Sequence, residues 1–287
     1  RAALADPEDA TYAWDAIQLA SASDNGAELD LTSPINGPAL GALVQYLVAP
    51  GKSSEALEAA QAALAAHPDE ALFHELRARA LRAAGDPGSA REALERALEL
   101  EPQRASALAE LAAQMAERGD RETAIALYDR ADRADPERAA YAWEAIQLVA
   151  ASDDGAEVER RLEAMLGRHG MHAGAANLLA QRLLARDPGR ALALARRAVR
   201  FRGGPDALDT LGRIQLERGD AERAARTLGR SAELRPDSPS THYWLGRARS
   251  AAGDEDGARR ALRAALEADS FPEKEAAQAE LARLNAD

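Results

Sequence analysis

The chain has 287 residues, of which 46 % are hydrophobic and only 4 % aromatic, and it contains no cysteine. The lack of cysteine excludes disulfides, thiolate catalysis and cysteine-ligated zinc. A formal net charge of −12 argues against a nucleic-acid backbone as the main partner. No apolar run reaches the roughly 18 residues that a membrane span needs. Because the sequence starts at Arg1 without a signal peptide, we expect a fragment or mature piece whose targeting information lies elsewhere.

The N-terminal segment 1–34 is predicted to be a partial repeat unit with one clear helix at roughly 8–22. Residues 1–30 share the motifs ADPE, YAW, AIQL and GAE with residues 130–159 in one register. The later copy continues into a second helix, whereas the first soon meets Pro34. Either the second helix of the first copy is shortened or residues are absent from this part of the sequence.

Residues 69–102 and 103–136 are two copies of one repeat. Superimposed, they align Ala78 with Ala112, Gly85 with Gly119, Ala90 with Ala124, Ala97 with Ala131 and Pro102 with Pro136. Self-similarity at a fixed spacing of this length is typical of helix–turn–helix solenoids. Glycine ends the first helix of a unit by adopting positive φ, and proline separates one unit from the next.

The same register runs along most of the chain and predicts seven full units. They cover 35–68, 69–102, 103–136, 137–170, 171–204, 205–238 and 239–270. Residues 271–287 follow as one more helix, whose polar outer face would cap the open end of the stack.

This pattern resembles the tetratricopeptide repeat family. The matching features are small residues at repeat positions 8, 20 and 27, a large apolar residue at 24, a Gly-Asp turn near 15 and proline at 32. The resemblance implies an all-α fold. The expected architecture is a right-handed superhelical solenoid of antiparallel helix pairs, with a partial unit at 1–34, seven units over 35–270 and a capping helix at 271–287.

The sequence offers no convincing active site, and we predict that the protein is not an enzyme and needs no cofactor. His169 and His172 are spaced to share a metal ion, but Gly170 separates them at a unit boundary and no third ligand is near. We therefore predict no metal site. Gly203-Gly204-Pro205 is predicted to be a turn between units, because no strand precedes it as a phosphate-binding loop requires.

The concave wall of the solenoid is the predicted binding surface. In the family's geometry the first helix of each unit lines this wall, which would place there Trp14, Gln18, Glu75, Arg79, Trp143, Gln147, Asn177, Gln181, Asp209, Arg213, Tyr243 and Arg247. Aromatic rings, amides and guanidiniums suit an extended polar ligand, either a peptide or a glycan. Alternatively, Trp14 and Trp143 pack between helices, and Asp209 and Arg213 pair with each other.

Residues 175–284 resemble, more narrowly, the C-terminal part of repeat lipoproteins of the exosortase (PEP-CTERM) system and of other bacterial exopolysaccharide export proteins. The segments that carry this likeness include AANLLAQRLLARDPGRALALARRAV and FPEKEAAQAELARL. The resemblance implies a periplasmic scaffold for protein partners, with a cytoplasmic location as the alternative. Two other functions stay open, namely a solenoid that binds the polysaccharide itself and a regulatory domain of a larger enzyme.

Overall fold

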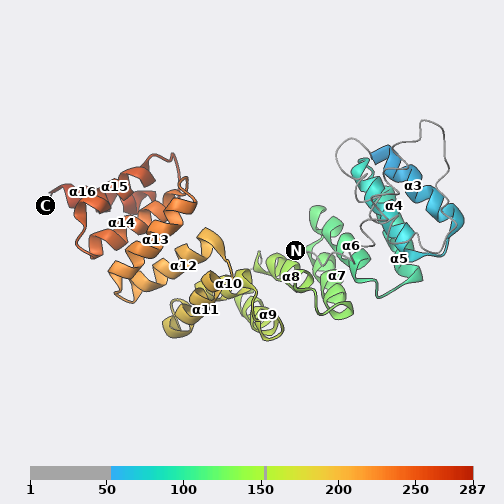
Figure 1. The fold of residues 1–287 in the computed structure, drawn as a ribbon, viewed down its shortest axis with the longest axis horizontal. Helices are drawn as coiled ribbons and strands as arrows, with labels where there is room; N and C mark the ends of the chain where they lie inside the picture. The colour runs from blue at the N-terminus through green and yellow to red at the C-terminus, as the bar shows by residue number, and fades with distance from the viewer. Residues whose placement is uncertain (1–52, 152–153, 287) are drawn as a thin grey trace, which may run out of the picture. The chain divides into compact units, whose positions relative to one another are not determined.

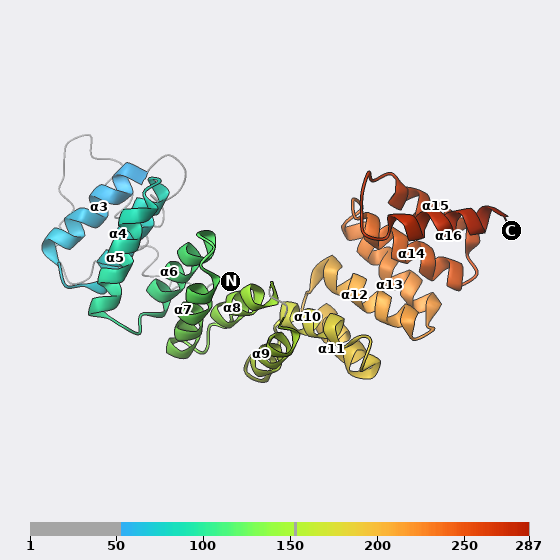
Figure 2. The same cartoon turned by 180° about the vertical axis from the view of Figure 1, so that it is seen from behind.

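The computed structural model describes residues 53–151 and 154–286, and this part of the chain consists of 14 α-helices without a strand (Figures 1 and 2). The helices pack as successive pairs, which confirms the predicted all-α architecture of stacked repeats. The chain divides into two compact units, Arg1–Leu148 and Val149–Asp287. The predicted partial unit 1–34, with Trp14 and Gln18, lies outside the described residues.

The first unit contains α3 to α7 and most of α8. Their bounds are α3 Ser53–Ala66, α4 Ala71–Ala83, α5 Pro87–Leu100, α6 Ala105–Glu117, α7 Arg121–Ala134 and α8 Ala139–Ala150. Helix α4 packs along α5, and α6 packs along α7. Buried leucines and alanines fill the space between these pairs, with Leu94 and Leu108 fully buried at its centre.

The second unit holds the remaining eight helices. They are α9 Gly155–Arg168, α10 Ala173–Leu183, α11 Pro188–Arg200, α12 Gly204–Glu217, α13 Ala221–Leu234, α14 Pro239–Ala251, α15 Glu255–Leu266 and α16 Lys274–Ala286. The pairs α10/α11, α12/α13 and α14/α15 follow one another, and the first helices of adjacent pairs, α10, α12 and α14, also touch.

The Gly-Asp dipeptides of the sequence build the turn inside a pair. Gly85 and Gly119 have φ of 84°, a left-handed conformation that favours glycine and ends the first helix. The aspartate that follows is the N-cap of the second helix, where the side chain of Asp86 accepts from the backbone N–H of Ser89. One short phrase therefore stops one helix and starts the next.

Small residues at two repeat positions allow the helices of a pair to approach closely. The alanines at position 20 are fully buried in six units, at Ala56, Ala90, Ala124, Ala191, Ala224 and Ala258. At position 8, Gly212 and Gly246 face the buried leucines Leu228 and Leu262. A Cβ atom added to these glycines would lie 2.5 Å and 2.7 Å from the leucine Cγ atoms.

Helix α16 packs on the last pair. Its Ala277 and Leu284 are buried in one cluster with Tyr243 and Leu262. The Nε–H of Arg259 on α15 donates to the carbonyl of Leu284 at 2.9 Å, which ties the end of α16 to the second helix of the pair.

Gly212→Ala and Gly246→Ala should each lower the free energy of unfolding by about 1–3 kcal/mol, because the new methyl group overpacks a buried leucine. Gly229→Ala is the matched control, since it lies in α13 with no atom within 4 Å of the added Cβ. That change should raise stability by about 0.5–1 kcal/mol through helix propensity. Urea unfolding followed by circular dichroism measures all three. A gain for Gly212→Ala equal to that of Gly229→Ala would contradict the packing argument.

Candidate functional site

The row of first helices α10, α12 and α14 carries six of the predicted site residues. They occupy two equivalent positions, four residues apart, on each helix. The earlier position holds Asn177, Asp209 and Tyr243, and the later one holds Gln181, Arg213 and Arg247. The later position is the more open, because Gln181 and Arg247 are exposed, whereas Asn177 and Asp209 are only partly accessible.

Tyr243 does not lie on this surface. It is 6 % exposed and packs in the core with Leu262 and Leu284. Trp244, the next residue, is partly accessible in its place and packs against the core with one side, with the two rings edge-on at a centroid distance of 5.1 Å. An α-helix turns by about 100° per residue, so a shift of one residue is enough to exchange a core position for a surface position.

Trp244 is the centre of the site. The guanidinium carbon of Arg213, from α12, lies 4.5 Å from the centroid of the indole, and that of Arg247, one turn along α14, lies 5.3 Å from it. Both distances are within the range of cation–π attraction. The indole N–H donates to Oε1 of Glu273 at 3.3 Å, just before α16. Two cationic side chains are thus held around one aromatic ring.

The acids near Trp244 already have other donors. Glu273 also accepts a hydrogen bond from the hydroxyl of Ser240 at 2.7 Å. Glu280 accepts from Ser250 and Arg283, at 3.0 Å and 2.8 Å, and the hydrogen bond from Arg283 is the main cause that lowers the pKa of its carboxyl. Arg247 itself has no hydrogen bond or ion pair with any described residue and is exposed.

Asp209 is a partly buried acidic group of the row. Burial raises the pKa of its carboxyl, and a hydrogen bond from Thr241 and the charges of Arg213 and Arg235 oppose the shift. Its contact with Arg213 is long, at 4.0 Å, and its Oδ1 is covered without a hydrogen-bond partner in the described structure. The predicted alternative, in which Asp209 neutralises Arg213, therefore corresponds to a weak contact.

The neighbouring helix α10 contributes amides. The side chain of Gln181 donates to the hydroxyl of Thr210 on α12 at 2.9 Å, which links the two inner helices. The Oδ1 of Asn177 is covered and lacks a donor among the described residues. Asn177 is therefore less accessible than Gln181, one turn further along the helix.

In the first unit, Glu75 and Arg79 belong to an ion network between α4 and α6. Glu75 is 2 % exposed and accepts from Arg79, Arg104 and, at 2.8 Å, the hydroxyl of Ser106. Arg79 also pairs with Glu110. Both predicted residues are therefore engaged within the protein, and their packing role is evident from the structure.

Trp143 and Gln147 lie on α8. Trp143 is partly buried and has interactions within the chain, and Gln147 is exposed and donates to Oε2 of Glu144 at 3.4 Å.

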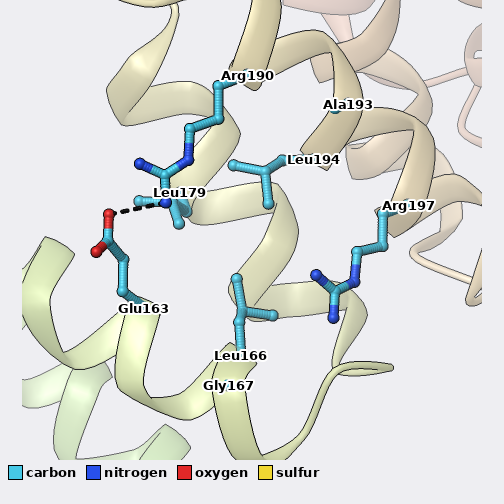
Figure 3. Close-up of a pocket in the computed structure, with 8 residues that line it drawn as sticks. All are labelled: Glu163, Leu166, Gly167, Leu179, Arg190, Ala193, Leu194 and Arg197. Carbon is cyan, nitrogen blue, oxygen red and sulfur yellow. Dashed lines mark hydrogen bonds and ion pairs between the residues drawn. The ribbon is translucent and has the colours of Figure 1, made fainter.

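A pocket of about 330 Å³ opens elsewhere on the second unit, between α9, α10 and α11 (Figure 3). Leu166, Leu179 and Leu194 form its apolar centre. Arg190, paired with Glu163 at 3.0 Å, and Arg197 lie at its edges.

Within 53–151 and 154–286 there is no group of three or more acidic or histidine side chains that could hold a metal ion. The same ranges contain no helix that is both long and apolar enough to cross a membrane.

Two sequence models of the tetratricopeptide repeat match the chain, one over residues 42–103 and the other over 81–151 and 215–284. Together these ranges cover more than half of the 287 residues, so the chain belongs to the tetratricopeptide repeat family. Proteins of this family are generally protein-interaction scaffolds and typically non-catalytic. No curated protein matches the sequence.

Solved structures share the fold. The C-terminal part of a tetratricopeptide repeat-containing protein from Cytophaga hutchinsonii matches with a TM-score of 0.61 and 12 % identity, over 84 % of this chain and 99 % of that one. The Cut9–Hcn1 hetero-tetramer of the APC/C matches with a TM-score of 0.58 and 13 % identity, over 96 % of this chain and 52 % of that one. YrrB matches with a TM-score of 0.52 and 21 % identity, over 62 % of this chain and 92 % of that one. At these identities the likeness extends to the fold alone.

Asp209→Asn should increase stability at pH 7, because a neutral amide avoids the burial of a weakly paired charge. A carboxyl with a raised folded pKa stabilises the folded state fully below its unfolded pKa, and this contribution is lost as the pH rises through its folded pKa. The advantage of the asparagine variant should therefore shrink from pH 7 to pH 3.5. Urea midpoints at both pH values measure it.

Asp206→Asn is the control for this pH dependence, because Asp206 is exposed and pairs with Arg235 at 2.7 Å. Loss of this exposed ion pair should lower the free energy of unfolding by at most about 1 kcal/mol at pH 7. A lower midpoint for Asp209→Asn than for the unmodified chain at pH 7 would show that the contact with Arg213 outweighs burial.

Proposed function

We propose that the protein is a non-catalytic scaffold that binds an extended segment of a partner protein along α10, α12 and α14, with Trp244 at the centre of the site. The observation that carries this proposal is the convergence of Arg213 and Arg247, from successive helices, on one indole ring. Successive inner helices in such a stack lie about 8–10 Å apart, so three of them offer a track for several residues of an extended chain.

The chemistry of this surface suits a ligand with a carboxylate beside an apolar group. A guanidinium offers a planar fork that matches a carboxylate, and the aromatic ring beside it offers apolar contact. The side chain of Arg213 is 39 % exposed, and Arg247 has no anion paired with it among the described residues. Because Glu273 and Glu280 already accept other hydrogen bonds, they compete weakly for these arginines.

A peptide fits better than a polysaccharide that stacks on Trp244. Stacking of a sugar needs an open ring face, whereas here two guanidiniums lie within 5.3 Å of the ring centroid. Among the structural neighbours, YrrB is described as a protein with an unusual peptide-binding site. That description belongs to YrrB, and it is consistent with a fold that accepts peptides.

We place the partner, as a finer proposal, in a bacterial exopolysaccharide export system, with a periplasmic location. Support for this setting comes from the resemblance of residues 175–284 to repeat lipoproteins of such systems. Binding of the polysaccharide itself and a role as a regulatory domain of a larger enzyme remain as alternatives. Purification of the tagged chain from cells separates these functions. Export proteins that co-purify support the scaffold, whereas the glycan or an enzyme supports the respective alternative.

Arg213→Ala with Arg247→Ala should lower the affinity for a selected peptide at least tenfold, because both forked donors are removed while no small packing site is changed. The peptide can be selected from a display library against the full chain. Its affinity is then measured by fluorescence anisotropy. Arg260→Ala with Arg263→Ala removes the same charge from exposed positions on α15 and is the matched control.

The control variant should bind within about twofold of the unmodified chain, and circular dichroism should show that both variants are folded. Unchanged affinity of the Arg213/Arg247 variant with an intact fold would move the binding surface away from Trp244. A selected peptide that both variants lose equally would indicate attraction to net charge alone.

A further inference from the structure

A second surface of the second unit is strongly basic, although the whole chain carries a net charge of −12. Helix α11 contains four arginines and no acidic residue. Its Arg196 and Arg200 are exposed, and so are Arg223, Arg226 and Arg230 on α13. These five residues are named the arginine groove below.

Two grooves between the second helices of neighbouring pairs flank α11 and α13. One is the pocket of Figure 3, between α9 and α11, and the other is a pocket of about 340 Å³ between α13 and α15. A leucine of the intervening first helix lies in each, Leu179 in one and Leu245 in the other. The two pockets therefore occupy the same place in the repeat, two units apart.

Counting from the N-cap aspartate of each second helix shows which positions line these grooves. The earlier helix contributes the ninth and thirteenth residues after its cap, and the later helix contributes the sixth and tenth. These positions hold Glu163, Gly167, Ala193 and Arg197 in the first pocket, and Gly229, Glu233, Arg260 and Ala264 in the second.

The same count between α11 and α13 gives arginine at every one of these positions. They are Arg196 and Arg200 after Asp187, and Arg226 and Arg230 after Asp220. Arg223 takes the place that Arg190 holds in the first pocket. Both helices pack on α12, where Leu211 is the counterpart of Leu179 and Leu245. By this equivalence, the five arginines occupy the positions that line an outer groove between α11 and α13.

Little within the protein neutralises this groove. Arg223 pairs with Asp220 at 3.0 Å and Arg226 with Glu222 at 3.7 Å, both as exposed pairs on the same helix, which are weak. Arg200 lies 5.8 Å from the ring centroid of its neighbour Phe201. Arg196 and Arg230 have no hydrogen bond, ion pair or ring contact with any residue that the structure describes. The two flanking grooves, by contrast, contain Glu163 and Glu233.

We propose that the arginine groove is a second docking surface, separate from the site at Trp244, and that it binds an acidic helical segment of a partner protein. Arg196 and Arg200 are four residues apart, as are Arg226 and Arg230, which is a rise of about 6 Å along each helix. Carboxylates four residues apart on a partner helix have the same spacing. The guanidinium fork matches a carboxylate, and clustered charge of one sign speeds the encounter with a partner of the other.

An anionic membrane is the less suitable partner. Interfacial binding combines positive charge with apolar side chains that enter the lipid. The exposed large apolar residues among the described residues are Met171 and Leu234, and neither occupies a groove-lining position. Anionic vesicles are accordingly an outcome of the test.

The triple variant Arg196→Ala, Arg200→Ala, Arg230→Ala tests the proposal. The probe is a fluorescein-labelled, alanine-based helical peptide with glutamates at i and i+4, measured by anisotropy with the full chain at about 150 mM salt. The unmodified chain should bind the probe, and the triple variant should bind at least tenfold more weakly. Replacing the same three residues by lysine should give an intermediate loss, since the charge remains but the fork is lost.

The matched control replaces Arg118, Arg121 and Arg133 of the first unit by alanine, because these are exposed and removing them changes the net charge equally. It should bind the probe within twofold of the unmodified chain, as should the Arg213/Arg247 variant. Equal losses in the control would overturn the proposal in favour of net charge. Failure of the unmodified chain to bind the peptide, or sedimentation with phosphatidylglycerol vesicles in its place, would also overturn it. Unchanged circular dichroism of the triple variant confirms that the fold is kept.

Discussion

The close approach of two helices within each pair is the contact on which the rest of the structure depends. In the second unit it is made by a glycine on the first helix and a leucine on the second, as in Gly212 against Leu228 and Gly246 against Leu262. Because a single Cβ atom would collide with the leucine, the distance between the helices is fixed at this point. Pairs of constant thickness can then stack, and residues at one repeat position fall into rows along the stack.

The two sides of this stack carry different chemistry. On the first helices, Asn177 and Asp209 are partly covered, whereas the position of Arg213 and Arg247 is more open. On the second helices, the ninth and thirteenth residues after each cap line grooves to the next pair. A repeat protein can therefore vary its contacts on either side without disturbing the alanine and leucine positions that hold each pair together.

Charge is distributed unevenly in this chain, and the distribution says more about partners than the net value of −12. In the first unit, Arg79 and Arg104 form an ion network around the buried Glu75. In the second unit, Arg247 and the arginine groove face outward with few anions bound to them. Two basic surfaces on one unit would allow the protein to bind two acidic segments at the same time, as a scaffold does.

The sequence by itself determined the repeat, its phase and the helical architecture, because glycine, aspartate and proline act locally and recur at fixed spacing. It also placed Arg213 and Arg247 in one row. Only the tertiary structure decided that Tyr243 is buried and Trp244 partly accessible, that Glu75 is enclosed by arginines, and that second helices line grooves on their outer side. The period specifies which residues are equivalent, whereas the rotation of each helix against its neighbours decides which equivalent side chains reach water.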